Sequence, residues 1–205
     1  HFTFDFNVNP YMTATIHQLE GRELKQIDEL CLKHPRNTTP AICREISRKY
    51  ANHESGVFIY GDPAGKHKDT RSEKGYNDFD LIMSGLSSFK SQLMVEKSAP
   101  PVVMRGNFIN ALFGGRIEGC SFIIHRECEN TIGDYNFVKE SQDGKKVKQK
   151  VRNAQTGVTY EKRGHTSDAN DYMICRIFAD EFRQFTRGGR EIKRTLSNSR
   201  TTHKF

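Results

Sequence analysis

A short apolar run between two glycines, Gly56-Val57-Phe58-Ile59-Tyr60-Gly61, most constrains what this chain can fold into. A strand that is apolar at every position is typical of a sheet that is covered on both faces. A helix is expected before it, because Thr39-Pro40 combines a capping hydroxyl with a proline at the first helical position, and this helix is expected to end near His53. A strand reached through a helical crossover tends to lie parallel to an earlier strand. The chain is therefore expected to have an α/β fold.

The first strand carries an acid on its polar face. Residues 2–8 alternate strictly, with phenylalanines on one face and Thr3, Asp5 and Asn7 on the other. Asp is disfavoured in strands because its side chain competes for backbone hydrogen bonds. A half-exposed strand also shows polar residues on its solvent face, so a structural and a functional interpretation of Asp5 both remain open.

Two more strands are expected before the crossover, at residues 11–19 and 23–32. Short links between strands imply antiparallel neighbours, so the chain opens with a three-stranded meander. The buried strand at 56–61 then lies beside the first strand and leads into Asp62, at the edge where open α/β sheets place their sites. Glu29, near the end of the third strand, is less well placed, and we expect it to be a structural or outer-shell acid.

The middle of the chain alternates further short elements. Helices are expected at 78–86, from Pro101 through Leu112 and at 131–140, and strands at 92–96 and 121–125. Residues 66–77 are polar and dense in charge, and we expect them to form a loop beside the site. His125 stands between two cysteines, but the spacings fit no zinc pattern, so a core histidine is the simpler interpretation.

A stretch rich in acids, Gly164-His165-Thr166-Ser167-Asp168-Ala169-Asn170-Asp171-Tyr172, leads into an apolar helix. Ser167 or Asp168 is expected to cap that helix. Asp168 and Asp171 are three residues apart, which places them on one helical face, one turn from each other. Acids in a first turn also suit the helix dipole, so this stretch alone does not require a metal site.

The positive charge of the chain is clustered. The formal net charge is +7, which favours a polyanionic partner such as nucleic acid. The segment 143–163 alone carries a net charge of +5, and its valines with turn residues at 153–157 predict a β-hairpin. This hairpin is either a solvated surface or an arm whose cations contact DNA phosphates. The candidate DNA-binding residues are Lys145, Lys146, Lys148, Lys150, Arg152, Lys162 and Arg163.

Several other classes of protein are not indicated. Five cysteines without CxxC spacing point to reduced, mostly buried thiols rather than to a disulfide framework or a zinc knuckle. No apolar run approaches the ~20 residues that span a bilayer. The loop from Gly61 to Lys66 has three residues between its glycines where a phosphate-binding loop has four, so no nucleotide site is expected.

Residues 186–205 are expected to form a basic, disordered tail after one domain at 1–185.

Three acids that are far apart in the sequence are expected to meet in one cleft: Asp5, Asp62 and Asp168. Carboxylates that lie close repel one another unless a hard cation neutralises them, and Mg²⁺ or Mn²⁺ prefers such oxygen ligands. A pair of these ions about 4 Å apart can activate a water and stabilise the leaving oxygen of a phosphodiester. We therefore expect metal-dependent hydrolysis of a nucleic acid.

The order and spacing of three motifs resemble a known family. The motifs are Phe4-Asp5-Phe6-Asn7, Tyr60-Gly61-Asp62-Pro63 and His165-Thr166-Ser167-Asp168-Ala169. Over roughly residues 1–182, the chain resembles the nuclease domain of tailed-phage terminase large subunits, within the ribonuclease H-like superfamily. The resemblance implies a mixed central sheet, in which a fourth and a fifth strand lie parallel to the first strand of the meander, flanked by helices and carrying the basic hairpin.

The resemblance also implies roles for the site residues. Asp5, Asp62 and Asp168 would be the metal-binding acids. His165 would match a histidine that some members carry three residues ahead of the last acid, and would orient water or assist proton transfer. Asp171 resembles the second acid of the related junction resolvases, and is a further candidate ligand for the metal.

By the same resemblance, the chain would be a Mg²⁺- or Mn²⁺-dependent endonuclease with one or two ions. It would cut concatemeric viral double-stranded DNA, with little sequence preference, during genome packaging in the cytoplasm of the infected bacterium. Its partners would be DNA, an ATPase motor on the same full-length chain, the portal and the small terminase subunit, with no membrane and no nucleotide in this fragment. Two alternatives remain: a non-catalytic DNA-binding module of the same fold, and a junction resolvase-like nuclease.

Overall fold

A computed structural model of the chain describes residues 1–66, 76–154 and 157–188. Its centre is a six-stranded mixed sheet with the strand order β5-β4-β1-β2-β3-β6. The strands are β1 (Phe2–Asp5), β2 (Met12–Glu20), β3 (Glu23–Leu32), β4 (Val57–Gly61), β5 (Ser91–Leu93) and β6 (Ser121–Ile124). The first three form the antiparallel meander, β4 lies parallel to β1, and β5 lies parallel to β4. The expected sheet is confirmed, and β6 extends it parallel to β3.

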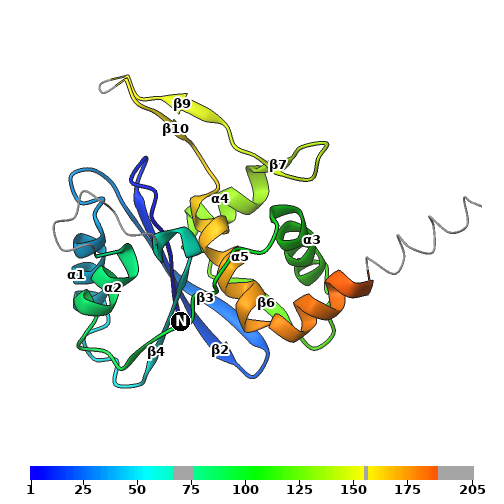
Figure 1. Cartoon of the computed structure of the whole chain (residues 1–205), viewed down its shortest axis with the longest axis horizontal. Coiled ribbons are helices and arrows are strands. Elements are labelled where there is room, and N and C mark those ends of the chain that lie inside the picture. The colour runs from blue at the N-terminus through cyan, green and yellow to red at the C-terminus, as the bar shows by residue number, and fades with distance from the viewer. Residues whose placement is uncertain (67–75, 155–156, 189–205) are drawn as a thin grey trace, which may run out of the picture.

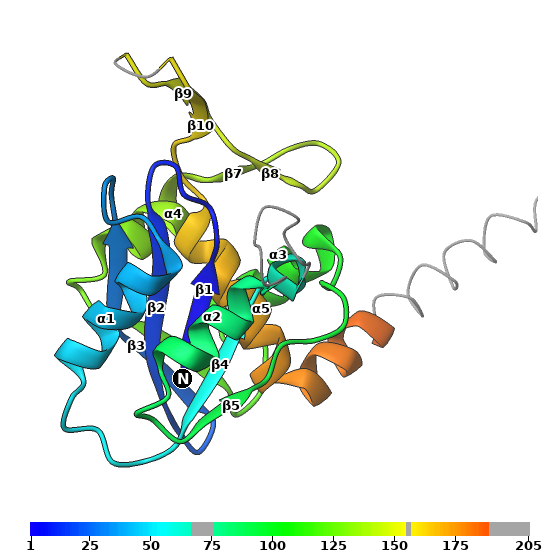
Figure 2. The same ribbon diagram turned by 60° about the vertical axis from the view of Figure 1, so that its left-hand side comes forward.

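Helices cover both faces of the sheet (Figure 1). They are α1 (Thr39–Lys49), α2 (Asp78–Gly85), α3 (Val102–Phe113), α4 (Glu129–Phe137) and α5 (His165–Ile177). The first two lie on one face, and the other three lie on the opposite face (Figures 1 and 2). A 3-10 turn at Pro63–Lys66 follows β4, and residues 179–188 are again helical. Each face has its own apolar core.

The alternation in β1 divides its side chains between the two faces. Phe2 and Phe4 pack in the core beneath α1 and α2. Thr3 faces α5 instead, since its Oγ1 donates a hydrogen bond of 2.8 Å to the carbonyl oxygen of Ala169. Asp5 follows Thr3 by two residues, so it points to the same face. The polar side of β1 is therefore the side that α5 covers.

Buried polar contacts fix α5 on the sheet. Thr15 Oγ1 donates to Asn170 Oδ1 at 2.7 Å, and Asn170 Nδ2 donates to Gln26 Oε1 at 2.8 Å. All three side chains are buried. Because a buried polar group needs a partner, these bonds favour one register of α5 against β2 and β3.

The start of α1 differs by one residue from the expectation. Thr38, not Thr39, is the capping residue, and its Oγ1 accepts a hydrogen bond from the backbone nitrogen of Ala41. Pro40 consequently lies at the second helical position, where its missing N–H is equally harmless. The helix ends at Lys49 rather than near His53.

The start of α5 was predicted wrongly, because its cap comes from another helix. The helix begins at His165, and neither Ser167 nor Asp168 caps it. Asp134 on α4 accepts hydrogen bonds from the backbone nitrogens of Thr166 and Ser167, at 3.0 and 3.3 Å. Such a contact between two helices leaves no local pattern in the sequence.

The cysteine prediction is confirmed and the His125 prediction is wrong. All five cysteines lie in described parts of the chain and are free, and all except Cys31 are buried. His125 is exposed, because it follows β6 at the edge of the sheet, where the chain turns away.

The predicted loop and the predicted tail lie mostly outside the residues that the structure describes. Of the predicted loop at 66–77, residues 67–75 lie outside the described residues, as do residues 189–205 of the predicted tail. Residues 186–188 are helical, so the helix extends past the expected boundary at 185. Within the described residues, no helix has the length and apolar character to span a membrane.

Candidate active site

Asp5 and Asp62 stand at the carboxyl ends of two neighbouring parallel strands. The pairing of β1 with β4 sets Phe4 opposite Gly61, so Asp5 and Asp62 come next in the register. Partners in parallel strands point to the same face, which here is the face covered by α5. A glycine is required beside them, because a Cβ on Gly61 would lie 2.8 Å from the carbonyl oxygen of Phe4.

The buried carboxylate of Asp5 is held by two side chains. Asn7 Nδ2 donates to both of its oxygens at 3.0 Å, and His165 Nδ1 lies 3.0 Å from Oδ2. His165 Nε2 lies 2.8 Å from the carbonyl oxygen of Glu161. Both ring nitrogens thus face acceptor oxygens, an arrangement that suits the doubly protonated ring. Burial lowers the pKa of His165, but the bonds to Asp5 and Glu161 outweigh it and raise the pKa above its ordinary value.

Asp62 is bound from α5 and from its own loop. Tyr172 donates its hydroxyl to Asp62 Oδ2 at 2.9 Å, and the backbone nitrogen of Ala64 donates to Oδ1 at 2.8 Å. Arg105, a buried residue of α3, lies over the Tyr172 ring, with its guanidinium carbon 4.3 Å from the ring centroid. Burial raises the pKa of Tyr172 to about 12, so the hydroxyl remains a donor at neutral pH.

Asp168 and Asp171 lie one turn apart on α5, as the spacing predicts, and two lysines bind them. Lys146 Nζ lies 2.8 Å from Asp168 Oδ1 and 2.6 Å from Asp171 Oδ2. Lys148 Nζ lies 2.7 Å from Asp168 Oδ2 and 2.7 Å from Glu161 Oε2. Each oxygen of Asp168 therefore has an ammonium partner.

These ion pairs set the charge of the two acids. Burial tends to raise the pKa of Asp168, but Lys146 and Lys148 outweigh it, and the pKa lies below its ordinary value. Burial dominates at Asp171, whose pKa lies above its ordinary value despite Lys146. Asp168 is therefore ionised at neutral pH, and the charge on Asp171 depends on the cation beside it.

The structure brings the predicted acids to one end of the sheet without completing a metal site. Asp5 and Asp62 are bound by His165 and Tyr172, which belong to the same helix as Asp168. These carboxylates have the chemistry that Mg²⁺ or Mn²⁺ prefers. Within the described ranges, however, no group of three or more His, Cys, Asp or Glu side chains is placed to hold a metal ion. The lysines on Asp168 explain part of this, since they occupy both of its oxygens.

The predicted basic hairpin is present. Its strands β9 (Lys150–Arg152) and β10 (Thr159–Glu161) project from the domain (Figure 1), and β7 (Lys139–Glu140) pairs with β8 (Lys146–Val147) at its base. Residues 155–156 of the turn lie outside the described residues.

The cations of the hairpin region fall into three groups. Lys146 and Lys148 are bound at the acids, so in this arrangement they are not available to phosphates. Arg163 lies over the ring of Phe137, 4.9 Å from its centroid. The exposed members are Lys145, Lys150, Arg152 and Lys162. Contact between these residues and DNA stays a prediction.

Sequence reasoning missed two residues beside the acids. Arg105 precedes the buried Phe108 by three positions, so helical spacing places it on the covered face of α3. A cation on a covered face needs an anionic or aromatic partner, and this requirement could have pointed to Arg105. Tyr135 donates its hydroxyl to Asp171 Oδ1 at 3.3 Å, and nothing in its local sequence indicates that contact.

Glu29 has a structural role at the start of α4, as we expected for this acid. It accepts hydrogen bonds from the backbone nitrogens of Asn130 and Thr131, at 2.7 and 2.9 Å, in the first turn of α4.

The strand order and the covered mixed sheet define a ribonuclease H-like fold of the kind found in terminase nuclease domains. The nuclease domain of the large terminase from bacteriophage SPP1, a structure with bound Mn, matches with a TM-score of 0.50 at 14% identity, over 83% of this chain and 82% of that chain. This match confirms the predicted likeness in fold.

The large terminase from a thermophilic bacteriophage also matches. One structure of it has a TM-score of 0.53 at 10% identity, and a second, in complex with ATP-gamma-S, has a TM-score of 0.55 at 12% identity. The matches cover 85% and 86% of this chain but 38% and 39% of those chains. No family model and no curated protein matches the sequence.

Proposed function

We propose that this domain is a divalent-cation-dependent endonuclease that cuts double-stranded viral DNA during genome packaging. The observation that carries the proposal is the gathering of Asp5, Asp62 and Asp168 at one end of a sheet with the fold of large-terminase nuclease domains. The bound Mn of the SPP1 domain supports Mg²⁺ or Mn²⁺ as the cofactor.

The residues around the acids suit this chemistry. Asp5, Asp62 and Asp168 would hold the cation, which when bound activates a water and stabilises the leaving oxygen. Asn7 and Tyr172 orient the carboxylates of Asp5 and Asp62. His165, which holds Asp5, would orient water or take part in proton transfer.

The assignment to packaging extends beyond this chain. The two structures from the thermophilic phage are large terminases of which this chain covers 38–39%. We accordingly place the domain in a longer protein with an ATPase motor, acting with a portal and a small terminase subunit in the cytoplasm of an infected bacterium. The exposed hairpin cations would contact the DNA backbone, which fits cutting with little sequence preference.

Replacing Asp5 tests the nuclease function. With Mn²⁺ present, we expect the parent to nick supercoiled plasmid and Asp5→Asn to be slower by more than about 100-fold, since loss of an outer-shell group alone costs about 10–100-fold. Glu118→Gln changes an exposed acid and serves as the control. Circular dichroism checks that both variants fold. An Asp5→Asn variant that cuts as fast as the parent would contradict the assignment.

A second candidate is a DNA-binding module that kept this fold without the chemistry. The lysines on both oxygens of Asp168 favour it, because they oppose metal binding in this arrangement. Binding of duplex DNA without cleavage in Mn²⁺ would support the module. Cleavage of a four-way junction but not of linear duplex would instead support a resolvase.

A further inference from the structure

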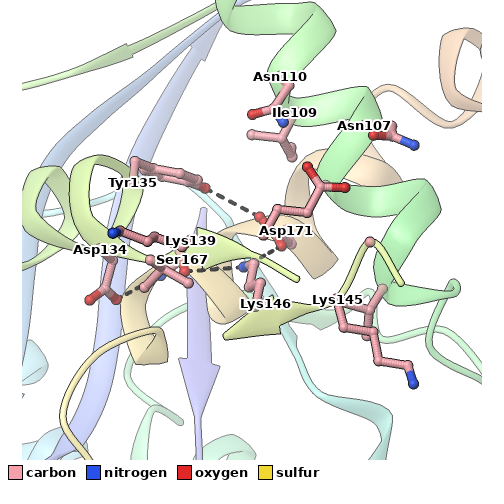
Figure 3. Close-up of a pocket in the computed structure, with 15 residues that line it drawn as sticks. Asn107, Ile109, Asn110, Asp134, Tyr135, Lys139, Lys145, Lys146, Ser167 and Asp171 are labelled. Carbon is pink, nitrogen blue, oxygen red and sulfur yellow. Dashed lines mark hydrogen bonds and ion pairs between the residues drawn. The ribbon is translucent and has the colours of Figure 1, made fainter. Parts of the chain in front are cut away.

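The ammonium group of Lys146 sits in a place built for a cation. Its acceptors are Ser167 Oγ at 3.1 Å, Asp168 Oδ1 at 2.8 Å and Asp171 Oδ2 at 2.6 Å. Figure 3 shows Lys146 directed at Ser167 and Asp171. An ammonium group has three donors, and each has an acceptor here.

The surroundings make this cation a fixed part of the fold. The side chain of Asp171 is 1% exposed, and that of Lys146 is 18% exposed. Asp171 Oδ1 accepts from Tyr135, so both oxygens of Asp171 are taken (Figure 3). Removing one partner of a buried ion pair is strongly destabilising, because it leaves an uncompensated charge in the interior. Lys146 is therefore held more firmly than an exposed lysine would be.

Lys148 is bound differently. It lies between β8 and β9, outside either strand, and reaches Asp168 Oδ2 together with the more exposed Glu161. Its side chain packs against Gly164, and a Cβ added to that glycine would lie 2.9 Å from Lys148 Cε. The side chain of Lys148 is 19% exposed, close to that of Lys146, but it has two acceptors where Lys146 has three. Of the two oxygens of Asp168, Oδ2 therefore has the partner that is held by fewer contacts.

We propose that Lys146 is the resident cation of the acidic site, so that the domain binds a single divalent ion rather than a pair. Its ammonium group takes the place between Asp168 and Asp171. The divalent ion binds at Asp5, Asp62 and the Asp168 oxygen that Lys148 releases. Asp171 is then a partner of Lys146 and not a metal ligand, and Lys146 is a positioning residue. This inference rests on the proposed function, because it concerns the metal of that same site.

Calorimetric titration with Mn²⁺ tests the inference without relying on activity. We expect one ion per parent chain and two per chain for Lys146→Met, in which the acids lose their ammonium partner. We also expect Mn²⁺ to raise the unfolding temperature of Lys146→Met more than that of the parent, because the ion replaces the lost cation. Lys97→Met, at an exposed lysine outside the hairpin, should behave as the parent.

Asp171→Asn gives a second test, which can be measured even if Lys146→Met does not fold. Asparagine keeps an oxygen that can accept from Lys146, so we expect one Mn²⁺ per chain and an affinity within about threefold of the parent. A larger loss would show that Asp171 is a metal ligand and would overturn the inference. Unchanged stoichiometry in a folded Lys146→Met would overturn it as well.

The outcomes separate this inference from the proposed function. Two ions per parent chain, with plasmid cleavage, would overturn the inference and leave the nuclease assignment standing. No binding and no cleavage would overturn both. One ion per parent chain, with parent-like binding by Asp171→Asn, supports the inference.

Discussion

His17 on β2 is a buried titratable residue on the same sheet as the candidate site. Its side chain is 2% exposed, and burial lowers its pKa well below the ordinary 6.5. The unfolded chain therefore binds a proton near pH 6.5 that the folded protein binds only at lower pH. Stability falls as the pH falls through this range, by up to about 1.4 kcal/mol per pH unit.

We expect His17→Leu to flatten this dependence, since leucine does not titrate. Urea unfolding between neutral and mildly acidic pH measures it, and His125→Leu, at an exposed histidine, is the control. Equal slopes for His17→Leu and the parent would contradict this, because they would mean that His17 binds its proton over the same pH range in the folded and unfolded states.

At the same scale, the positions of the acids follow from the sequence more directly than the identity of their partners. Asp5 and Asp62 follow from strand alternation and from the end of an apolar run, which are local patterns. The contact of Lys146 with Asp168 spans 22 positions and depends on how the hairpin folds back. Charge density therefore predicted a DNA contact for Lys146, whereas the structure places this residue at the acids.

Among the elements, α4 depends on a single acid of β3. Besides the two backbone nitrogens, Glu29 accepts from Thr131 Oγ1 at 2.7 Å. A helix cap contributes about 0.5–2 kcal/mol. We expect Glu29→Gln to lose about 1–2 kcal/mol in denaturant unfolding, with Glu127→Gln, an exposed acid, as the control. Mn²⁺ stoichiometry should not change, and a loss of bound metal would make Glu29 a ligand.

Element types were easier to predict than the contacts between elements. The strands at 57–61 and 23–32 and the helix at 78–85 follow the apolar periodicity closely. The cap of α5 by Asp134 and its docking through Asn170 join parts of the chain that are 32 and 155 positions apart. No window of sequence contains such contacts, so the start of α5 was misplaced while its existence was not.

For the whole molecule, the net charge of +7 is the simplest guide to its partner. A cation that contacts a phosphate adds about one unit to the slope of log affinity against log salt. We expect Lys150→Ala to lower that slope by about 1, and Lys25→Ala, on β3 and away from the hairpin, to leave it unchanged. Fluorescence anisotropy with duplex DNA and a chelator measures binding without cleavage. A slope unaffected by Lys150→Ala would remove the hairpin from the DNA interface.

Glu161 is where the projecting hairpin meets both halves of the acidic site. Its carbonyl oxygen contacts the ring that holds Asp5, and its carboxylate contacts the lysine that covers Asp168. Glu161 is the last residue of β10, so one residue joins the hairpin to both contacts. Any shift of this strand would therefore displace the partners of Asp5 and Asp168 together.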